Sequence, residues 1–437
     1  MLSLPRKKTH KGKNMKFTKL SLAAALAVSA AFAGGDIAPV EPAAAAPAVP
    51  SVSKITGQAS LWYSTSDRRA NIDLFDKAGG TGDAALRLDY TRSMYDGMVT
   101  FNAGVQMLST LGLENTLVGA TFVSHGGHTG GLDDAMWIDV FNATISLGNT
   151  AIIAGRQAID TPFFYTETWN IAKNTFDAVV VANNDLPDTT LVGAWVGRGN
   201  GCPSTVCADD TNIGGGMNGF FGNHPAYAVG AVTKLIPNTV AQAWYYNIPS
   251  VADAYWVQAD ANIAGIEVGA QYAGTSLTGG PDSDAWAVRL GYSANDFGVW
   301  GAYSQRSDDA GLDISNIATM SLFPASTSAV KGSQSKLYTE AYWAYGYVGE
   351  QDAQSFAIGG HYDFGFATVN AQYTDVATDM DSANVRDMNE FYLGTTVDLG
   401  PVKTTVAYTS TEVGQSNGDG SDRFNTLIFM LDMPFEL

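Results

Sequence analysis

The last fifteen residues of the chain alternate between apolar and mostly polar positions. The apolar side chains share one parity: Leu427, Phe429, Leu431, Met433, Phe435 and Leu437. The other parity is largely polar or proline: Thr426, Asp432, Pro434 and Glu436. Because a strand places successive side chains on opposite faces, this segment predicts a strand with one apolar face. A transmembrane barrel can turn such a face to lipid and the opposite face to a watery lumen.

The same period of two recurs from residue 53 onward. It is clear at residues 86–90, 99–106, 266–272, 367–374 and 402–408, whereas segments of helical period are almost absent. The composition agrees, since 47 Gly, 19 Tyr, 20 Phe and 9 Trp accompany a mean hydropathy close to zero. We therefore predict an all-β domain over residues 53–437.

The number of strands follows from the connections. Nineteen runs qualify as strands, but a barrel whose two ends lie on the periplasmic side needs an even number. Residues 295–298, 363–365 and 399–401 have the turn chemistry of short periplasmic connections. A strand at 338–348 would reverse every later strand, so we assign residues 307–352 to a long external loop. The prediction is a transmembrane antiparallel β-barrel of 18 strands, with short periplasmic turns and long external loops.

Barrel size and aromatic placement indicate a channel. Tyrosines lie at one end of several predicted strands, at Tyr63, Tyr272, Tyr303, Tyr373 and Tyr408, and at the other end of others, at Tyr90, Tyr292 and Tyr362. Such residues form the two aromatic girdles of a membrane barrel. About eight strands are filled by their own side chains, whereas about 16 to 18 leave an aqueous channel. Transport is therefore the expected function.

The amino terminus predicts export. Met15 is a better start than Met1, because Lys16 and Lys19 precede an apolar stretch that ends in a small-x-small cleavage site at Ala31 to Ala33. We assign residues 1–33 to a signal peptide cleaved after Ala33, and the Ala/Pro-rich residues 34–52 to a flexible lead-in. The apolar stretch is too short to span a bilayer. The expected location is the bacterial outer membrane.

The net charge of the mature chain limits the classes of partner that it can bind. Of 24 Lys and Arg, seven lie before Gly34, whereas none of the 43 Asp and Glu does, so the mature chain carries 17 − 43 = −26. This surplus excludes a nucleic-acid partner and favours cations over anions. An alternative is that acidic loops only keep the outside soluble and hold divalent ions between lipopolysaccharide phosphates.

One long connection is unusually aromatic. Residues 158–173 carry Phe163, Phe164, Tyr165 and Trp169, which solvent would not accommodate well. Folding into the lumen would bury these rings and form a constriction with four charged residues: Arg156, Asp160, Glu167 and Lys173. The alternatives are an aromatic cap on the rim or a contact between subunits.

Inward parity adds a set of charged wall residues. The expected pore-lining residues are Arg87, Asp89, Asp260, Glu267, Arg289, Glu390 and Lys403. Opposed positive and negative wall segments would orient dipolar solutes. No nucleophile with histidine and acid partners is evident, so the sequence predicts no enzyme.

The remaining candidates are a disulfide and a metal site. Cys202 and Cys207 lie in a polar loop of an exported chain, so we expect them to pair. His125 and His128 have a spacing that zinc could use on a helix, but glycines oppose a helix there. Acid pairs such as Asp308 and Asp309 offer oxygen ligands for calcium without the spacing of a calcium loop. We assign no cofactor, and a structural calcium ion remains an alternative.

The run GRQAIDTP at 155–162, followed by TWN at 168–170 and TFDAVVVANNDLPDTTLVGAW at 175–195, resembles the major outer-membrane porins of campylobacter-like ε-proteobacteria. The resemblance covers the barrel, and those porins are related in architecture to the eighteen-stranded specific porins of pseudomonads. It implies a trimeric, cation-favouring general porin with an inward third external loop and, in some relatives, a calcium ion near the constriction. The chain departs from the usual aromatic end by finishing at Leu437, which bears on recognition by the barrel-assembly machinery.

The function expected from these observations is passive diffusion of small hydrophilic solutes and ions through an outer-membrane porin. The expected partners are those solutes, outer-membrane lipid and lipopolysaccharide, the barrel-assembly machinery and two further copies of the chain in a homotrimer. Two alternatives remain: a substrate-specific channel, and a surface protein or adhesin that uses the barrel only as an anchor.

Overall fold

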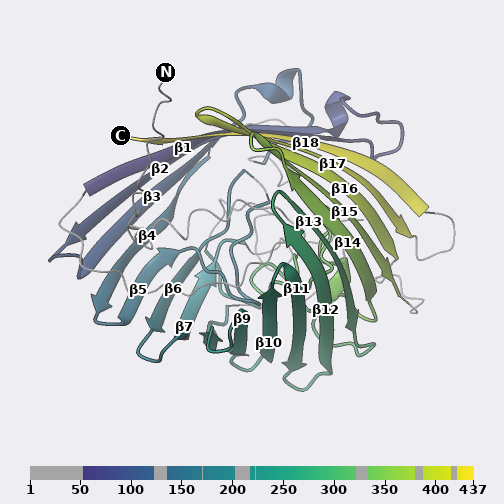
Figure 1. Cartoon of the computed structure of the whole chain (residues 1–437). Helices are drawn as coiled ribbons and strands as arrows, with labels where there is room; N and C mark the ends of the chain where they lie inside the picture. The colour runs from purple at the N-terminus through teal and green to yellow at the C-terminus, as the bar shows by residue number, and fades with distance from the viewer. Residues whose placement is uncertain are drawn as a thin grey trace, which may run out of the picture.

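In the computed structural model, eighteen strands close into one antiparallel barrel (Figure 1). The structure describes residues 53–122, 135–169, 171–201, 217–221, 223–320, 333–378, 387–414 and 421–437. The predicted signal peptide at 1–33 and the lead-in at 34–52 lie outside these ranges. Within the described ranges, no helix is long and apolar enough to cross a membrane.

The strands follow one another around the barrel in chain order. Their bounds are β1 Ser53–Ser66, β2 Gly80–Met94, β3 Val99–Ser109, β4 Ala135–Leu147, β5 Thr150–Gln157, β6 Phe176–Asn183, β7 Thr189–Gly199, β8 Ala226–Thr233, β9 Thr239–Ile248, β10 Ala252–Ile263, β11 Ile266–Leu277, β12 Asp282–Ala294, β13 Phe297–Arg306, β14 Gln354–Asp363, β15 Ala367–Ala377, β16 Met388–Leu399, β17 Val402–Gly414 and β18 Ser421–Glu436. In the described connections lie three single-turn 3₁₀ helices, η2 Lys77–Gly79, η3 Leu113–Asn115 and η4 Tyr347–Gly349.

The last strand closes the barrel on the first. β1 pairs with both β2 and β18, and Tyr63 lies opposite Phe429 in that closing register. The backbone N–H of Leu437 donates to the carbonyl of Ile55, at 3.0 Å, just beyond the paired segment. Closure leaves no unpaired sheet edge. The predicted count of eighteen antiparallel strands is confirmed.

The alternation seen in the sequence becomes two faces of the wall. On β18, Leu431 and Met433 are 38% and 42% exposed on the outside, whereas Thr426 and Ile428 are buried on the inside. Large apolar side chains are exposed in the same way on β10 to β14, for example Val257, Leu290 and Ile358. The outer surface is therefore an apolar belt.

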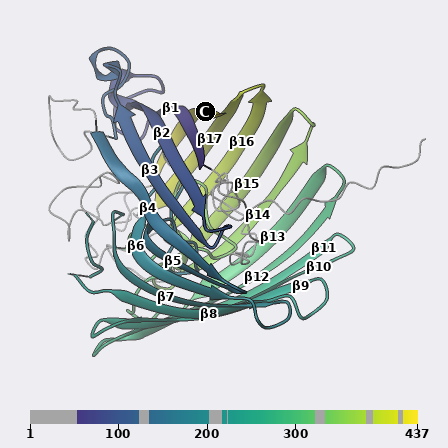
Figure 2. The same cartoon turned by 90° about the vertical axis from the view of Figure 1, so that its left-hand side faces the viewer.

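The two ends of the barrel differ in their connections, as the two views show (Figures 1 and 2). One end has tight turns, such as Asn295 and Asp296 between β12 and β13, where Asn295 adopts a positive φ of 53°. Gly365 and Gly400 also have positive φ in their turns, which glycine adopts without steric cost. These are the turns predicted to be short. The other end carries the long connections.

Two of those long connections fold into the barrel. The first inward loop, residues 158–175, joins β5 to β6, and the second inward loop, residues 307–353, joins β13 to β14. Leu312, Ile314 and Leu337 of the second loop are buried in the same apolar cluster as Phe163 of the first. The boundaries predicted for the 307–352 connection agree with the strands on either side. Its described residues, however, lie inside the barrel rather than in an external loop, because their apolar side chains pack against the inner wall.

Candidate functional site

Aromatic side chains fasten the first inward loop to one wall. Phe163 makes edge-to-face contacts with Tyr246 of β9 and Trp256 of β10, each at 5.6 Å between ring centroids. Phe164 makes the same kind of contact, at 4.9 Å, with Phe220 in the connection between β7 and β8. Both phenylalanines are almost fully buried, and burying each side chain stabilises by about 1.5 to 3 kcal/mol. The loop is therefore held inside the barrel by its own aromatic residues.

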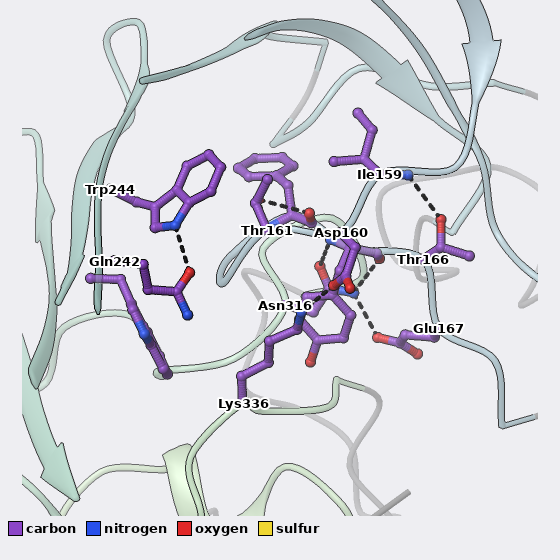
Figure 3. Close-up of polar contacts among 12 residues, drawn as sticks. Ile159, Asp160, Thr161, Thr166, Glu167, Gln242, Trp244, Asn316 and Lys336 are labelled. Atoms are coloured by element: carbon purple, nitrogen blue, oxygen red, sulfur yellow. Dashed lines mark hydrogen bonds and ion pairs between the residues drawn. The ribbon is translucent and has the colours of Figure 1, made fainter. Parts of the chain in front are cut away.

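The second inward loop is hydrogen-bonded to the first (Figure 3). The backbone N–H of Ile317 donates to the carbonyl of Phe163 at 2.8 Å. The Asn316 side chain donates through Nδ2 to the carbonyl of Tyr165 and to Glu167 Oε1, at 2.9 Å in each case. The two connections are thus joined to each other inside the barrel.

Glu167 lies in the contact between the two inward loops and does not face the lumen. Its carboxylate accepts hydrogen bonds from Asn316, from Thr319 Oγ1 at 2.6 Å and from Trp169 Nε1 at 2.9 Å. The residue is 5% exposed, and this burial raises the pKa of its carboxyl group. The expectation that Glu167 faces permeating solutes and wall bases is therefore wrong, because neighbouring polar groups enclose it.

Asp160 keeps contact with the lumen. It forms an ion pair with Lys336 of the second inward loop, and its side chain is 44% exposed (Figure 3). The Lys336 ammonium also lies 4.7 Å from the centre of the Tyr165 ring. The sequence analysis did not select Lys336, whose distance from Asp160 along the chain hides the contact. One positive and one negative group therefore stand together where the two loops meet.

Arg156 does not belong to the constriction. It lies opposite Phe141 of β4 in the strand register, and Phe141 is 54% exposed on the outer face. Its inward neighbour in the chain is Gln157, which is buried and bonds the carbonyl of Ala178 at 3.2 Å. The predicted role of Arg156 in the pore is wrong, because its strand turns it outward.

Lys173 joins the wall charges predicted on β2. Arg87 Nε lies 2.9 Å from Asp89 and 3.2 Å from Asp139 of β4. Burial, then repulsion from Arg87, lowers the pKa of Lys173 to about 8, and attraction to Asp139 and Asp89 opposes that shift. A Cβ on Gly104 would come within 2.5 Å of Asp89 and 2.7 Å of Asp139, so glycine makes room for the carboxylates. Asp139 was missed because it stands at a β-bulge, where inward parity shifts.

The opposite wall carries a second set of charges. Asp260 of β10 accepts a hydrogen bond from the hydroxyl of Tyr338, in the second inward loop, and one from Gln258 at 2.7 Å. Glu267 of β11 faces Arg289 of β12, with 3.8 Å between Oε2 and the guanidinium. Arg289 also lies over Trp300, at 4.9 Å from the ring centre. These three predicted lining residues are inside the barrel, as expected from parity.

Glu390 fixes the second inward loop to the wall. Its carboxylate accepts the backbone N–H groups of Trp343 and Ala344, at 2.8 Å each, and the hydroxyl of Thr411 at 2.9 Å. It is inside the barrel, as predicted, but it is buried and anchors a loop. Lys403 takes an inward position of β17 and lies opposite Asp432 of β18 in the register.

A second carboxylate holds the second inward loop internally. Glu340 accepts the backbone N–H of Ser335 at 2.6 Å and that of Gly346 at 2.8 Å. Burial raises the pKa of Glu340 to about 8. The sequence analysis assigned this segment to a loop, but it selected neither Glu340 nor the inward course of the loop. The apolar residues of the loop, such as Ile314 and Leu337, are the signal that could have identified it.

Several sequence candidates lie outside the described residues. Cys202, Cys207, His125 and His128 are among them, so the predicted disulfide stays a prediction. Within the described part of the chain, no group of three or more His, Cys, Asp or Glu side chains could hold a metal ion. The chemistry that remains in view is electrostatic: paired charges on two walls and at the junction of two loops.

Comparison with known proteins places the fold. No family model matches the chain, and the search of curated proteins finds no match. Among solved structures, Pseudomonas aeruginosa OccK3 (OpdO) matches with a TM-score of 0.67 and 14% identity, covering 90% of this chain and 97% of that one. P. aeruginosa OpdK, solved with vanillate, matches with a TM-score of 0.69 and 11% identity, covering 88% and 99%. Acinetobacter baumannii OccAB1 matches with a TM-score of 0.66 and 12% identity, covering 88% and 97%. The chain shares the fold of these barrels over 88% to 90% of its length.

Proposed function

We propose that this protein is an outer-membrane channel through which small hydrophilic solutes and ions diffuse, without catalysis. The observation that carries the proposal is the pair of inward loops, which are fastened to separate parts of the wall of a closed 18-stranded barrel and bring charged groups to its interior. The apolar outer belt suits a lipid environment, and the matching solved structures support the same kind of protein.

The proposal includes a preference for cations. The mature chain carries −26, and at the loop junction Asp160 is more exposed than its partner Lys336. Field lines concentrate in a narrow aqueous passage with low-dielectric walls, so an acidic surplus raises the local concentration of cations. Signal cleavage after Ala33, a homotrimer and kinship with the ε-proteobacterial porins belong to the same proposal and rest on the sequence.

The test is electrical recording of the purified chain in a planar bilayer. We expect stepwise conductance and a reversal potential that favours potassium over chloride in a salt gradient. The preference should weaken from 0.1 M to 1 M salt, because the Debye length falls from about 10 Å to about 3 Å. Absence of conductance from a correctly folded barrel would support an anchor or adhesin, and anion preference at low salt would contradict the cation claim.

A second candidate is a substrate-specific channel. Trp169 of the first inward loop lies 6.1 Å from Trp343 and 5.5 Å from Tyr345 of the second, which gives the junction an aromatic side. A solute with a ring could stack there while its polar groups meet the wall charges. Saturable block of the ionic current by one class of solute would favour this candidate over general diffusion.

A further inference from the structure

Three charged residues from neighbouring strands gather on the outer face of the wall. Arg156 lies on β5, Asp177 on β6 and Arg198 on β7, and the register pairs Asp177 with both arginines. The flanking Phe176 and Ala178 are buried on the inner side, which turns Asp177 outward. A register shift between Asp177 and Ala178 places Arg198 beside them. The cluster is thus separated from the lumen by the wall.

The cluster has a surplus of positive charge. Arg156 Nε lies 2.8 Å from Asp177 Oδ1, and Arg198 Nε lies 2.7 Å from Asp177 Oδ2. One carboxylate therefore orients two guanidinium groups and neutralises one. The side chain of Arg198 is 53% exposed, so a ligand outside the barrel can reach its guanidinium group. A second anion would complete the charge balance.

The height of the cluster on the barrel matches the outer aromatic level. Arg156 stands six positions beyond Thr150, where β5 leaves its short turn, and Asp177 stands six positions before Asn183, where β6 enters the next one. Tyr272 lies the same six positions beyond the start of β11. Aromatic side chains of such barrels mark the boundary between lipid tails and headgroups. The two arginines therefore reach headgroup depth at the end with the long connections.

The surroundings suit a lipid more than a soluble anion. Phe141 and Ile138 of β4 and Trp195 of β7 are exposed apolar side chains next to the cluster. Arg156 Nη1 also donates to the carbonyl of Ile138 at 2.9 Å, which joins the cluster to this apolar surface. Guanidinium forks bind phosphate oxygens in pairs, and the apolar neighbours can contact acyl chains.

We propose that Arg156, Asp177 and Arg198 form a binding site for the phosphate of a phosphorylated glycolipid in the outer leaflet. The inference rests on the proposed outer-membrane location. Two arginines supply the phosphate-binding groups, and Asp177 is a positioning residue that holds them side by side. The site would hold one lipid molecule at a defined place on the outer face of β5, β6 and β7.

The test compares three variants of the refolded barrel: Arg198→Gln, Arg156→Gln with Arg198→Gln, and Arg423→Gln as the control. Arg423 also lies exposed at the long-connection end, where it forms an ion pair with Glu412 of β17. The probe is lipid A carrying its phosphates, titrated into detergent-solubilised barrel and counted by native mass spectrometry. Chemically dephosphorylated lipid A and phosphatidylglycerol serve as matched lipids. Heat-dependent electrophoretic mobility verifies that each barrel is closed.

We expect the single variant to bind lipid A about tenfold more weakly than the parent, because charge-assisted hydrogen bonds are lost. The double variant should bind it more weakly still. The Arg423→Gln barrel should bind it like the parent, and the parent should bind the dephosphorylated lipid and phosphatidylglycerol less tightly. Equal binding by parent and double variant would overturn the site, as would equal binding of phosphatidylglycerol. A change in the number of subunits in the double variant would instead identify a contact between copies. Conductance of the same preparations tests the channel separately, so failure of the lipid site leaves that result intact.

Discussion

At the scale of single residues, strand parity predicted wall positions well and failed where both faces of a strand are apolar. Asp260, Glu267 and Arg289 were predicted correctly to lie inside the barrel, because apolar and polar residues alternate clearly along their strands. β5 has apolar residues on both faces, so the sequence did not reveal that Arg156 points outward. Glu167 was selected correctly as part of an inward segment, but its hydrogen bonds to Asn316 and Thr319 depend on a loop distant in the chain.

Lys173 should make ion selectivity depend on pH. Its pKa is lowered to about 8, so it is charged at pH 7 and loses its proton as the pH rises through that value. Loss of this positive charge beside Arg87, Asp89 and Asp139 should increase the preference for cations between about pH 7 and pH 9. Reversal potentials measured over that range check the prediction.

The control for this titration is the Lys173→Gln channel, which should start more cation-preferring and lack most of the step. Glu340 also has a pKa of about 8, and its ionisation would survive in this variant. A step of unchanged size in Lys173→Gln would therefore assign the pH dependence to another group. The linkage to folding has the matching sign: a lowered pKa of a lysine means that stability rises with pH through about 8 to 10, as far as this group is concerned.

At the scale of elements, the two inward loops differ in how far the sequence revealed them. The first was predicted because Phe163, Phe164 and Tyr165 are adjacent in the chain. The second was placed outside because residues 338–348 qualified as a strand, and a strand there would have reversed every later strand of the barrel. Its position is fixed by contacts with three separate strands, through Gln271, Gln372 and Glu390, which no local pattern reports.

Replacing Glu390 with alanine should loosen the second inward loop. The change removes the acceptor of two buried backbone N–H groups, those of Trp343 and Ala344, and an unsatisfied buried donor costs about 1 to 3 kcal/mol. We expect more frequent transitions between conductance levels in single-channel records and faster protease cleavage within residues 307–353. The matched control is Glu412→Ala, one strand away on the outer face of β17, which should behave like the parent. Identical current noise in both variants would show that Glu390 does not anchor the loop.

At the scale of the whole molecule, the architecture could be predicted because a closed barrel imposes global rules. An even strand number, alternating short and long connections, and one apolar face per strand together fixed eighteen strands. These rules act on every strand at once, so an ambiguous strand such as β5 is determined by its neighbours. The interior obeys no comparable rule, since any loop long enough and apolar enough can fill it. The fold was therefore more predictable than the lining of the passage.

The most direct test of the account is the single-channel conductance of a barrel that lacks residues 163–167. This deletion removes the aromatic contacts with β9 and β10, and the acceptors through which Asn316 and Thr319 of the second inward loop hold the first. With heat-dependent mobility showing that the barrel still closes, the account predicts a conductance higher by roughly twofold or more, because the contacts that hold the two loops together inside the barrel are lost. A conductance equal to that of the parent would contradict it and would place the narrowest passage elsewhere.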